Sequence, residues 1–141
     1  MRFIFDLDHT VIDSSHRAAT RADGSLDLDH WRENSTPTMI AKDSLLPLAD
    51  QWRKARAKGS EIIVCTARVM GLADYEFLGA HGLLADAVLS RKEGDDSKDH
   101  DLKLRLLFNY AQERGLSFRR FKMFSVMFDD NKNVINHLTA N

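Results

Sequence analysis

Acidic side chains follow two short apolar runs near opposite ends of the chain. Asp6 and Asp8 come directly after the run Arg2–Phe5, and Asp129 and Asp130 follow a run near the carboxyl end. Carboxylates that converge without a counter-charge repel one another strongly. A hard divalent cation removes that cost, and a set of oxygen ligands suits Mg²⁺. The two acid pairs therefore predict a magnesium site, provided that the fold brings them together.

The same residue types suit phosphate-ester hydrolysis. An aspartate beside such a cation, here Asp6, can attack phosphorus and form an aspartyl-phosphate. A second acid two residues on, Asp8, can protonate the leaving alcohol and then activate water. Thr66 and Arg68 follow a third apolar run, and with a lysine they would neutralise and orient the other phosphate oxygens. The pattern predicts a Mg²⁺-dependent phosphomonoesterase.

The elements that must position these residues have the pattern of an α/β fold. Four runs are continuously apolar, as in buried strands, and cover residues 2–5, 61–66, 86–90 and 121–128. Four segments of helical pattern alternate with them and cover residues 43–58, 72–80, 99–114 and 131–138. This alternation predicts a three-layer, Rossmann-like fold with a mainly parallel sheet. Ligands bind at the carboxyl ends of such strands, where all the candidate residues stand.

Composition limits the function further. The 141 residues are enough for one compact domain, 1–141, and they carry 20 Lys and Arg against 21 Asp and Glu. This balance excludes nucleic-acid binding through bulk positive charge, although it allows a local basic groove. The one cysteine excludes an intrachain disulfide. No apolar run has the length of a signal peptide or a membrane span, so we expect a cytoplasmic protein.

Residues 11–42 form a polar, irregular insertion after the first run, with one short helical turn expected near 28–32. The insertion is too short for a large cap domain, and we interpret it as a small lid. Trp31 lies within it. A packing role is the simpler interpretation of this tryptophan, and stacking on a nucleobase is the alternative.

A resemblance supports the chemistry. The stretch Asp6–Thr10, of sequence DLDHT, resembles the DxDxT nucleophile motif of the haloacid dehalogenase superfamily of phosphohydrolases. The run that ends at Thr66 resembles the second motif, and the pair Asp129 and Asp130 resembles the acidic fourth motif. The motifs occur in the family order. The resemblance implies a haloacid dehalogenase-like fold, Asp6 as nucleophile and Asp8 as general acid and base.

A narrower resemblance adds site residues. Residues 91–98, RKEGDDSK, are similar to the arginine–x–x–glycine–aspartate–x–x–lysine stretch in the 3′-phosphatase domain of bacteriophage polynucleotide kinase. That domain also has arginines at the positions of Arg17 and Arg68. The resemblance implies a polynucleotide or nucleotide 3′-phosphate as substrate. Its implied phosphate-binding and site-supporting residues are Thr66, Lys98, Arg68, Arg17 and Asp95, and its implied Mg²⁺ ligands are Asp6, Asp129, Asp130 and the Asp8 carbonyl.

Several alternatives stay open. Lys92 and Lys103 compete with Lys98 for the phosphate-binding role, and either Asp129 or Asp130 could ligate Mg²⁺ directly. The same chemistry would serve a small-molecule nucleotidase or a sugar phosphatase. His9 stands where the superfamily usually has glycine, which also allows a degenerate binding module. The chain stops soon after the fourth motif, so we expect an uncovered sheet edge that favours a homo-oligomer.

Overall fold

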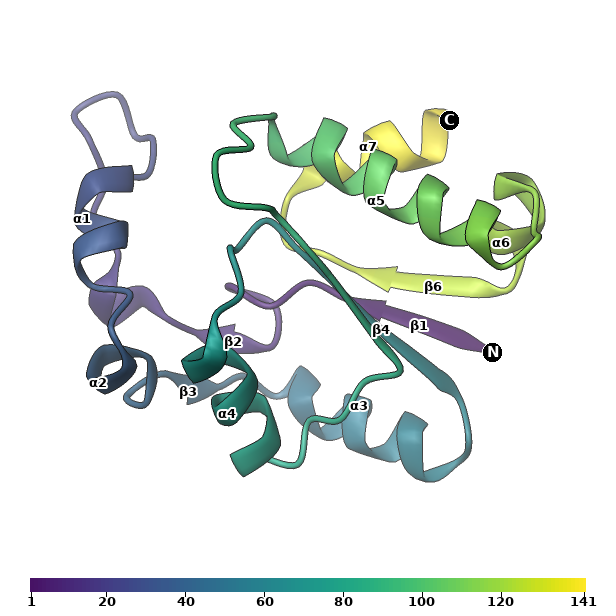
Figure 1. The fold of residues 1–141 in the computed structure, drawn as a ribbon, viewed down its shortest axis with the longest axis horizontal. Coiled ribbons are helices and arrows are strands. Elements are labelled where there is room, and N and C mark those ends of the chain that lie inside the picture. The colour runs from purple at the N-terminus through teal and green to yellow at the C-terminus, as the bar shows by residue number, and fades with distance from the viewer.

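The computed structural model describes residues 1–141 and contains a parallel sheet with helices on both faces (Figure 1). The strand order is β5-β4-β1-β6, and every pairing in the sheet is parallel. The strand β1 is therefore central, and its carboxyl end lies between those of β4 and β6. The predicted α/β fold is confirmed. The four strands are β1 (Arg2–Phe5), β4 (Glu61–Thr66), β5 (Ala87–Ser90) and β6 (Ser125–Phe128).

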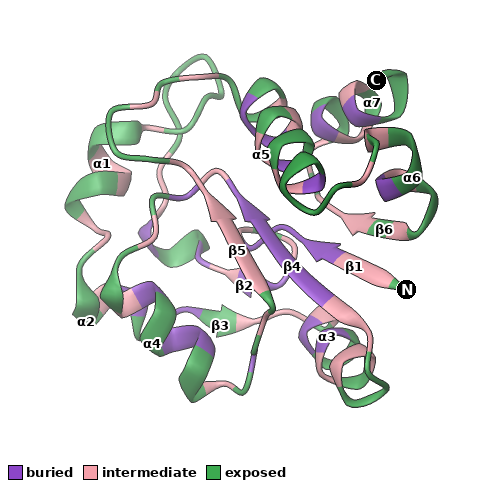
Figure 2. Ribbon diagram, turned by 45° about the vertical axis from the view of Figure 1, so that its right-hand side comes forward, coloured by how far each residue is buried: buried purple, intermediate pink, exposed green.

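Alternation along β4 divides the core into two halves. Ile62 and Val64 face one layer of helices, and Ile63 and Cys65 face the other, because successive side chains point to opposite faces of a strand. Figure 2 shows β4 buried along almost its whole length, while the edge strands β5 and β6 are mostly of intermediate exposure. Burial raises the pKa of the Cys65 thiol to about 12, as expected for a cysteine that serves as a small core residue.

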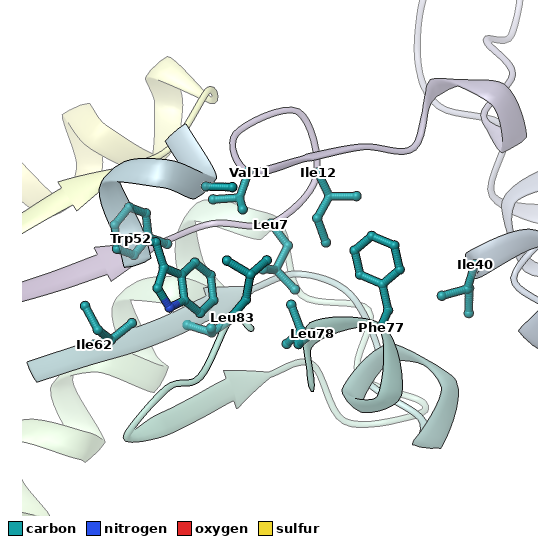
Figure 3. Close-up of a cluster of buried hydrophobic side chains, with 12 residues drawn as sticks. Leu7, Val11, Ile12, Ile40, Trp52, Ile62, Phe77, Leu78 and Leu83 are labelled. Atoms are coloured by element: carbon teal, nitrogen blue, oxygen red, sulfur yellow. The ribbon is translucent and has the colours of Figure 1, made fainter. Parts of the chain in front are cut away.

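Helices cover each face of the sheet. On one face Trp52 packs below Phe5, with ring centroids 5.1 Å apart, and lies in the apolar cluster shown in Figure 3. On the other face Leu107 and Phe121 pack against Ile4. The first layer contains α3 (Leu48–Ala57) and α4 (Leu72–Ala80), and the second contains α5 (Asp99–Glu113), α6 (Phe118–Met123) and α7 (Lys132–Ala140).

The insertion after β1 is a small lid closed by two short strands. Figure 1 shows it beyond the carboxyl ends of the sheet strands. Ile40 is buried and belongs to the same apolar cluster as Phe77 of α4, which ties the lid to the rest of the domain (Figure 3). The elements are β2 (Ile12–Asp13), the 3₁₀ helix η1 (Ser15–Arg17), α1 (Leu28–Glu33), α2 (Pro37–Ile40) and β3 (Ser44–Leu45).

Two element boundaries differ from the sequence-based expectation. The helix expected from residue 43 begins at Leu48, because Ser44–Leu45 pairs with β2. The strand expected over 121–128 is a short helix followed by a strand. Ser117 starts that helix, since its hydroxyl accepts the Arg120 N–H at 3.2 Å. Apolar residues in so short a segment do not distinguish a helix from a strand.

One edge of the sheet is formed by β6, as expected. Met123, Phe124 and Val126 are exposed along it or directly before it. Association of two chains through this edge stays a prediction.

None of the helices is long and apolar enough to cross a membrane.

Candidate active site

Three carboxylates meet at the carboxyl ends of β1 and β6. Asp6 follows β1 directly, and Asp129 and Asp130 follow β6. One oxygen from each lies within 4.8 Å of the others. Three hard oxygen donors at this separation fit Mg²⁺ and would not suit a soft metal. The parallel pairing of β1 with β6 explains the convergence, because both strands end at the same level.

Lys103 lies between two of these acids. Its Nζ donates to Asp6 Oδ1 at 3.0 Å and to Asp129 Oδ2 at 2.6 Å, and the residue is only 2% exposed. Burial alone would lower the pKa of Lys103, but the charges of Asp6 and Asp129 outweigh it and raise the pKa. The lysine therefore stays charged at the centre of the acidic cluster.

Lys98, the lysine implied by the narrower resemblance, is placed differently. It is exposed and immediately precedes the first turn of α5, whereas Lys103 lies on the face of α5 that packs on the sheet. Lys98 makes no side-chain hydrogen bond or ion pair, and Lys92 is also exposed. Of the three lysines considered, Lys103 is the one in contact with Asp6.

Asp6 is oriented by the turn that follows it. The Thr10 hydroxyl donates to Asp6 Oδ2 at 3.1 Å, and the same oxygen atom of Thr10 accepts the Asp130 N–H at 3.2 Å. Thr10 thus links the two acidic segments. Burial raises the pKa of Asp6 to about 7, and the lysine only partly opposes this effect. A bound cation would favour the ionised carboxylate.

Asp8 has a different environment from Asp6. The Ser14 hydroxyl donates to Asp8 Oδ1 at 2.7 Å, and Arg68 donates to both carboxylate oxygens, with Nε 3.2 Å from Oδ2. Burial would raise the pKa of Asp8, but the charge and hydrogen bonds of Arg68 outweigh it and lower the pKa. The two acids of the DLDHT stretch are therefore tuned in opposite directions, as is typical of catalytic pairs.

Arg68 is buried and links Asp8 to helix α4. Its Nη1 donates to Asp74 Oδ1 of α4 at 2.7 Å, and its backbone N–H donates to the Thr66 hydroxyl at 3.0 Å. Burial would lower the pKa of Arg68, but Asp8 and Asp74 raise it. Thr66, at the end of β4, is fully buried behind this arginine. Asp74 was not identified from the sequence, because an acid in the first turn of a helix has a sufficient explanation as a cap.

Arg17 belongs to the same network through a second unpredicted acid. Its Nε and Nη2 each lie 3.0 Å from an oxygen of Asp43, and its Nη1 donates to Ser35 at 2.9 Å. Asp43 also lies 3.7 Å from Arg68 Nη2. The chain of charges runs from the lid to Asp8. No local sequence pattern indicates the partners of Asp43.

Hydrogen bonds within the loop 91–98 fix its conformation. Arg91 donates to the backbone carbonyls of Ala67, Asp95 and Ser97, each at 2.8 Å. The Asp95 carboxylate accepts from Ser97 and from Arg105. The contacts of Asp95 are thus with its own loop and with α5, and none is with Asp6. The bond from Arg91 to Ala67 anchors the loop to the residue that follows β4.

His9 is the only residue other than glycine with a positive φ, at 64°. Its N–H donates to the Ile12 carbonyl at 2.9 Å, so the strained backbone closes the turn that carries Asp8 and Thr10. The imidazole is exposed. A side chain at this backbone conformation costs stability that glycine would not.

We therefore expect His9→Gly to raise the free energy of unfolding by about 0.5–1 kcal/mol, which is the strain relief less the added freedom of the unfolded chain. His9→Ala is the matched control, because alanine keeps the β-carbon and hence the strain. Urea denaturation measures both variants. A glycine variant no more stable than the alanine variant would contradict this explanation.

The fold is haloacid dehalogenase-like, with three carboxylates at the carboxyl edge of its parallel sheet. The structure is similar to the haloacid dehalogenase-like hydrolase SP0104 from Streptococcus pneumoniae, with a TM-score of 0.68 and 11% identity over 99% of this chain and 80% of that one. It is also similar to chains in two structures of the Pnkp1/Rnl/Hen1 complex, described in one as an RNA repair complex. Their TM-scores are 0.60 and 0.63, both are 22% identical, and they cover 96% and 95% of this chain and 37% and 40% of those.

Residues 1–139 match the family described as bacteriophage T5 5′-deoxynucleotidase, and the chain belongs to that family. The 5′-deoxynucleotidase of Escherichia phage T5 is 39% identical over 84 residues, which make up 57% of this chain and 34% of that protein. The match thus spans about a third of the relative's length. The superfamily expected from the DLDHT stretch is confirmed at the level of fold.

Proposed function

We propose that this chain is a Mg²⁺-dependent nucleotide phosphatase that hydrolyses deoxynucleoside 5′-monophosphates through an aspartyl-phosphate on Asp6. The observation that carries the proposal is the position of Asp6, which is in contact with Lys103 and Thr10 and adjacent to the acidic pair that follows β6. The family's name supports the substrate.

The first half of the reaction uses both acids of the turn. A carboxylate oxygen of Asp6 forms a bond to phosphorus as the bond from phosphorus to the nucleoside oxygen breaks, and Asp8 gives that oxygen a proton. Lys103 holds the nucleophile in place and offsets developing charge. Asp6, Asp129, Asp130 and the Asp8 carbonyl would hold Mg²⁺, which when bound supplies positive charge against the phosphate oxygens.

The second half regenerates the enzyme. Asp8, now a carboxylate, takes a proton from water, the water oxygen bonds to phosphorus, and the bond to Asp6 breaks. The lowered pKa of Asp8 beside Arg68 suits this role as a base. In the first half the negative charge of an arriving phosphate favours the protonated acid. Arg68 thus positions Asp8. Thr66 accepts the Arg68 N–H, and Asp43 links Arg17 to Arg68.

A second candidate substrate is a polynucleotide 3′-phosphate. The similarity of residues 91–98 to the phosphatase domain of polynucleotide kinase favours it, and the insertion 11–42 is too short for a large cap domain. The sugar-phosphate alternative lacks such an observation.

A substrate panel tests the proposal. Purified protein is assayed for phosphate release from deoxynucleoside 5′-monophosphates, 3′-phosphorylated oligonucleotides and sugar phosphates, with Mg²⁺ and with EDTA. We expect the highest kcat/KM for the 5′-monophosphates, loss in EDTA and recovery on adding Mg²⁺. A preference for the oligonucleotides would establish the second candidate. Absence of turnover with every ester would reject the enzyme and favour a binding module.

A further inference from the structure

Trp31 lies against the arginines of the charge network that leads to Asp8. The Arg17 guanidinium carbon is 4.1 Å from the centroid of the indole, and that of Arg68 is 5.8 Å from it. Both guanidiniums are held by Asp43, and Arg68 pairs with Asp8. Only one arginine therefore separates the indole from a catalytic carboxylate.

Ser35 links the backbone of Trp31 to the Arg17 side chain. Ser35 accepts from Arg17 Nη1, and its hydroxyl donates to the Trp31 carbonyl at 2.6 Å. Arg17 is itself 1% exposed, and its Nε and Nη2 both donate to the Asp43 carboxylate. Helix α1, which carries Trp31, lies in the lid beyond the carboxyl ends of the strands (Figure 1). A rigid aromatic side chain loses little entropy when a ligand stacks on it.

The two tryptophans of the chain differ in their surroundings. Trp52 is fully buried, and its indole N–H donates to the Leu84 carbonyl at 2.9 Å. Trp31 is only partly buried, and its indole N–H has no partner in the chain. Because no buried side-chain nitrogen or oxygen is left without a partner, that N–H faces solvent. The edge of the Trp31 ring that carries this N–H is thus accessible to solvent.

We propose that Trp31 is a specificity-determining residue that stacks on the base of the nucleotide whose phosphate is attacked by Asp6. The inference rests on the proposed function. Every nucleobase has an aromatic face, so stacking would recognise nucleotides with little preference among bases. The Arg17 guanidinium lies over the Trp31 ring. Arg68, which pairs with Asp8, lies between Trp31 and that carboxylate.

The alternative role for Trp31 is to cover the buried charges of Arg17 and Asp43. The two roles make different predictions for removal of the Trp31 side chain. If it only covers buried charges, its loss weakens turnover of every substrate, whereas if it stacks on the base, its loss affects only substrates that have a base. Deoxyribose 5-phosphate keeps the sugar and the phosphate of the nucleotide and lacks the base. It therefore separates the two roles.

Trp31→Ala is expected to raise KM for a deoxynucleoside 5′-monophosphate about tenfold. We expect KM for deoxyribose 5-phosphate to change less than twofold. Leu28→Ala is the matched control, since Leu28 lies on the same helix and is 46% exposed. An equal loss of kcat/KM on both substrates would overturn the proposal. A wild-type protein that hydrolyses neither substrate would instead reject the proposed function.

Intrinsic fluorescence gives a second test that does not depend on turnover. In an Asp6→Asn background, binding of a deoxynucleoside 5′-monophosphate is expected to quench tryptophan emission. Trp31→Phe in the same background is expected to lose the quenching, while Trp52 continues to report the folded core. Quenching that persists undiminished in the Phe variant would show that the base lies elsewhere.

Discussion

Asp6→Asn is expected to lower the rate of phosphate release at least about 10³-fold. The amide nitrogen and oxygen can keep the contacts of Asp6 with Thr10 and Lys103, but the neutral side chain is a poor nucleophile. Folding should not suffer. Burial disfavours the charged carboxylate and raises the pKa of Asp6, and the asparagine side chain carries no charge to bury. The rate is measured with excess Mg²⁺ on the best substrate of the panel.

Asp13→Asn is the matched control for this variant. Asp13 lies in the same segment, but its carboxylate accepts only from Ser15, so its variant should keep nearly full activity. Mass spectrometry of acid-quenched wild-type protein should find a phosphoryl group on the peptide that contains Asp6. An Asp6→Asn variant with a rate within tenfold of the wild type would refute a covalent step at this residue.

Lys103→Met is expected to reduce kcat/KM about 100-fold and to destabilise the fold by about 3 kcal/mol. Methionine keeps the length of the side chain and removes the charge. Asp6 and Asp129 would then face each other without the shared cation that holds them 3.0 and 2.6 Å from one nitrogen. Kinetics and urea denaturation measure the two effects.

Lys98→Met gives the comparison that decides between the two lysines. Lys98 is exposed and unpaired, so its variant should stay within about threefold of wild-type activity and keep its stability. A larger loss of activity in Lys98→Met than in Lys103→Met would show that Lys98, not Lys103, serves the phosphate.

Much of the fold was predictable because its signals are local. The run Arg2–Phe5 and the run in β4 are rich in aromatic and β-branched residues, which favours buried strands, and α5 has a clear apolar face. The short helix before β6 was missed, since a six-residue helix has too few turns to show its period. The two-residue strand β3 was missed because its partner lies more than thirty residues away in sequence.

The site divides in the same way. The acids after β1 and β6 were identified because a strand end is recognisable in the sequence, and parallel strands end at a common edge. The choice among Lys92, Lys98 and Lys103 stayed open in the sequence. Lys98 and Lys103 differ by five residues and so by about 140° around a helix. Which of these directions faces Asp6 depends on how α5 packs on the sheet.

Residue types and their order along the chain were sufficient for the fold class, for the acidic pairs at the strand ends and for phosphate-ester chemistry, because these depend on local pattern. The partners of charged side chains required the folded chain. Asp43 pairs with Arg17, twenty-six residues earlier in the chain, and also lies near Arg68. Asp74 and Asp8 bind different nitrogens of the same Arg68 guanidinium. Electrostatic pairing depends on distance in space, and only tertiary packing determines that distance.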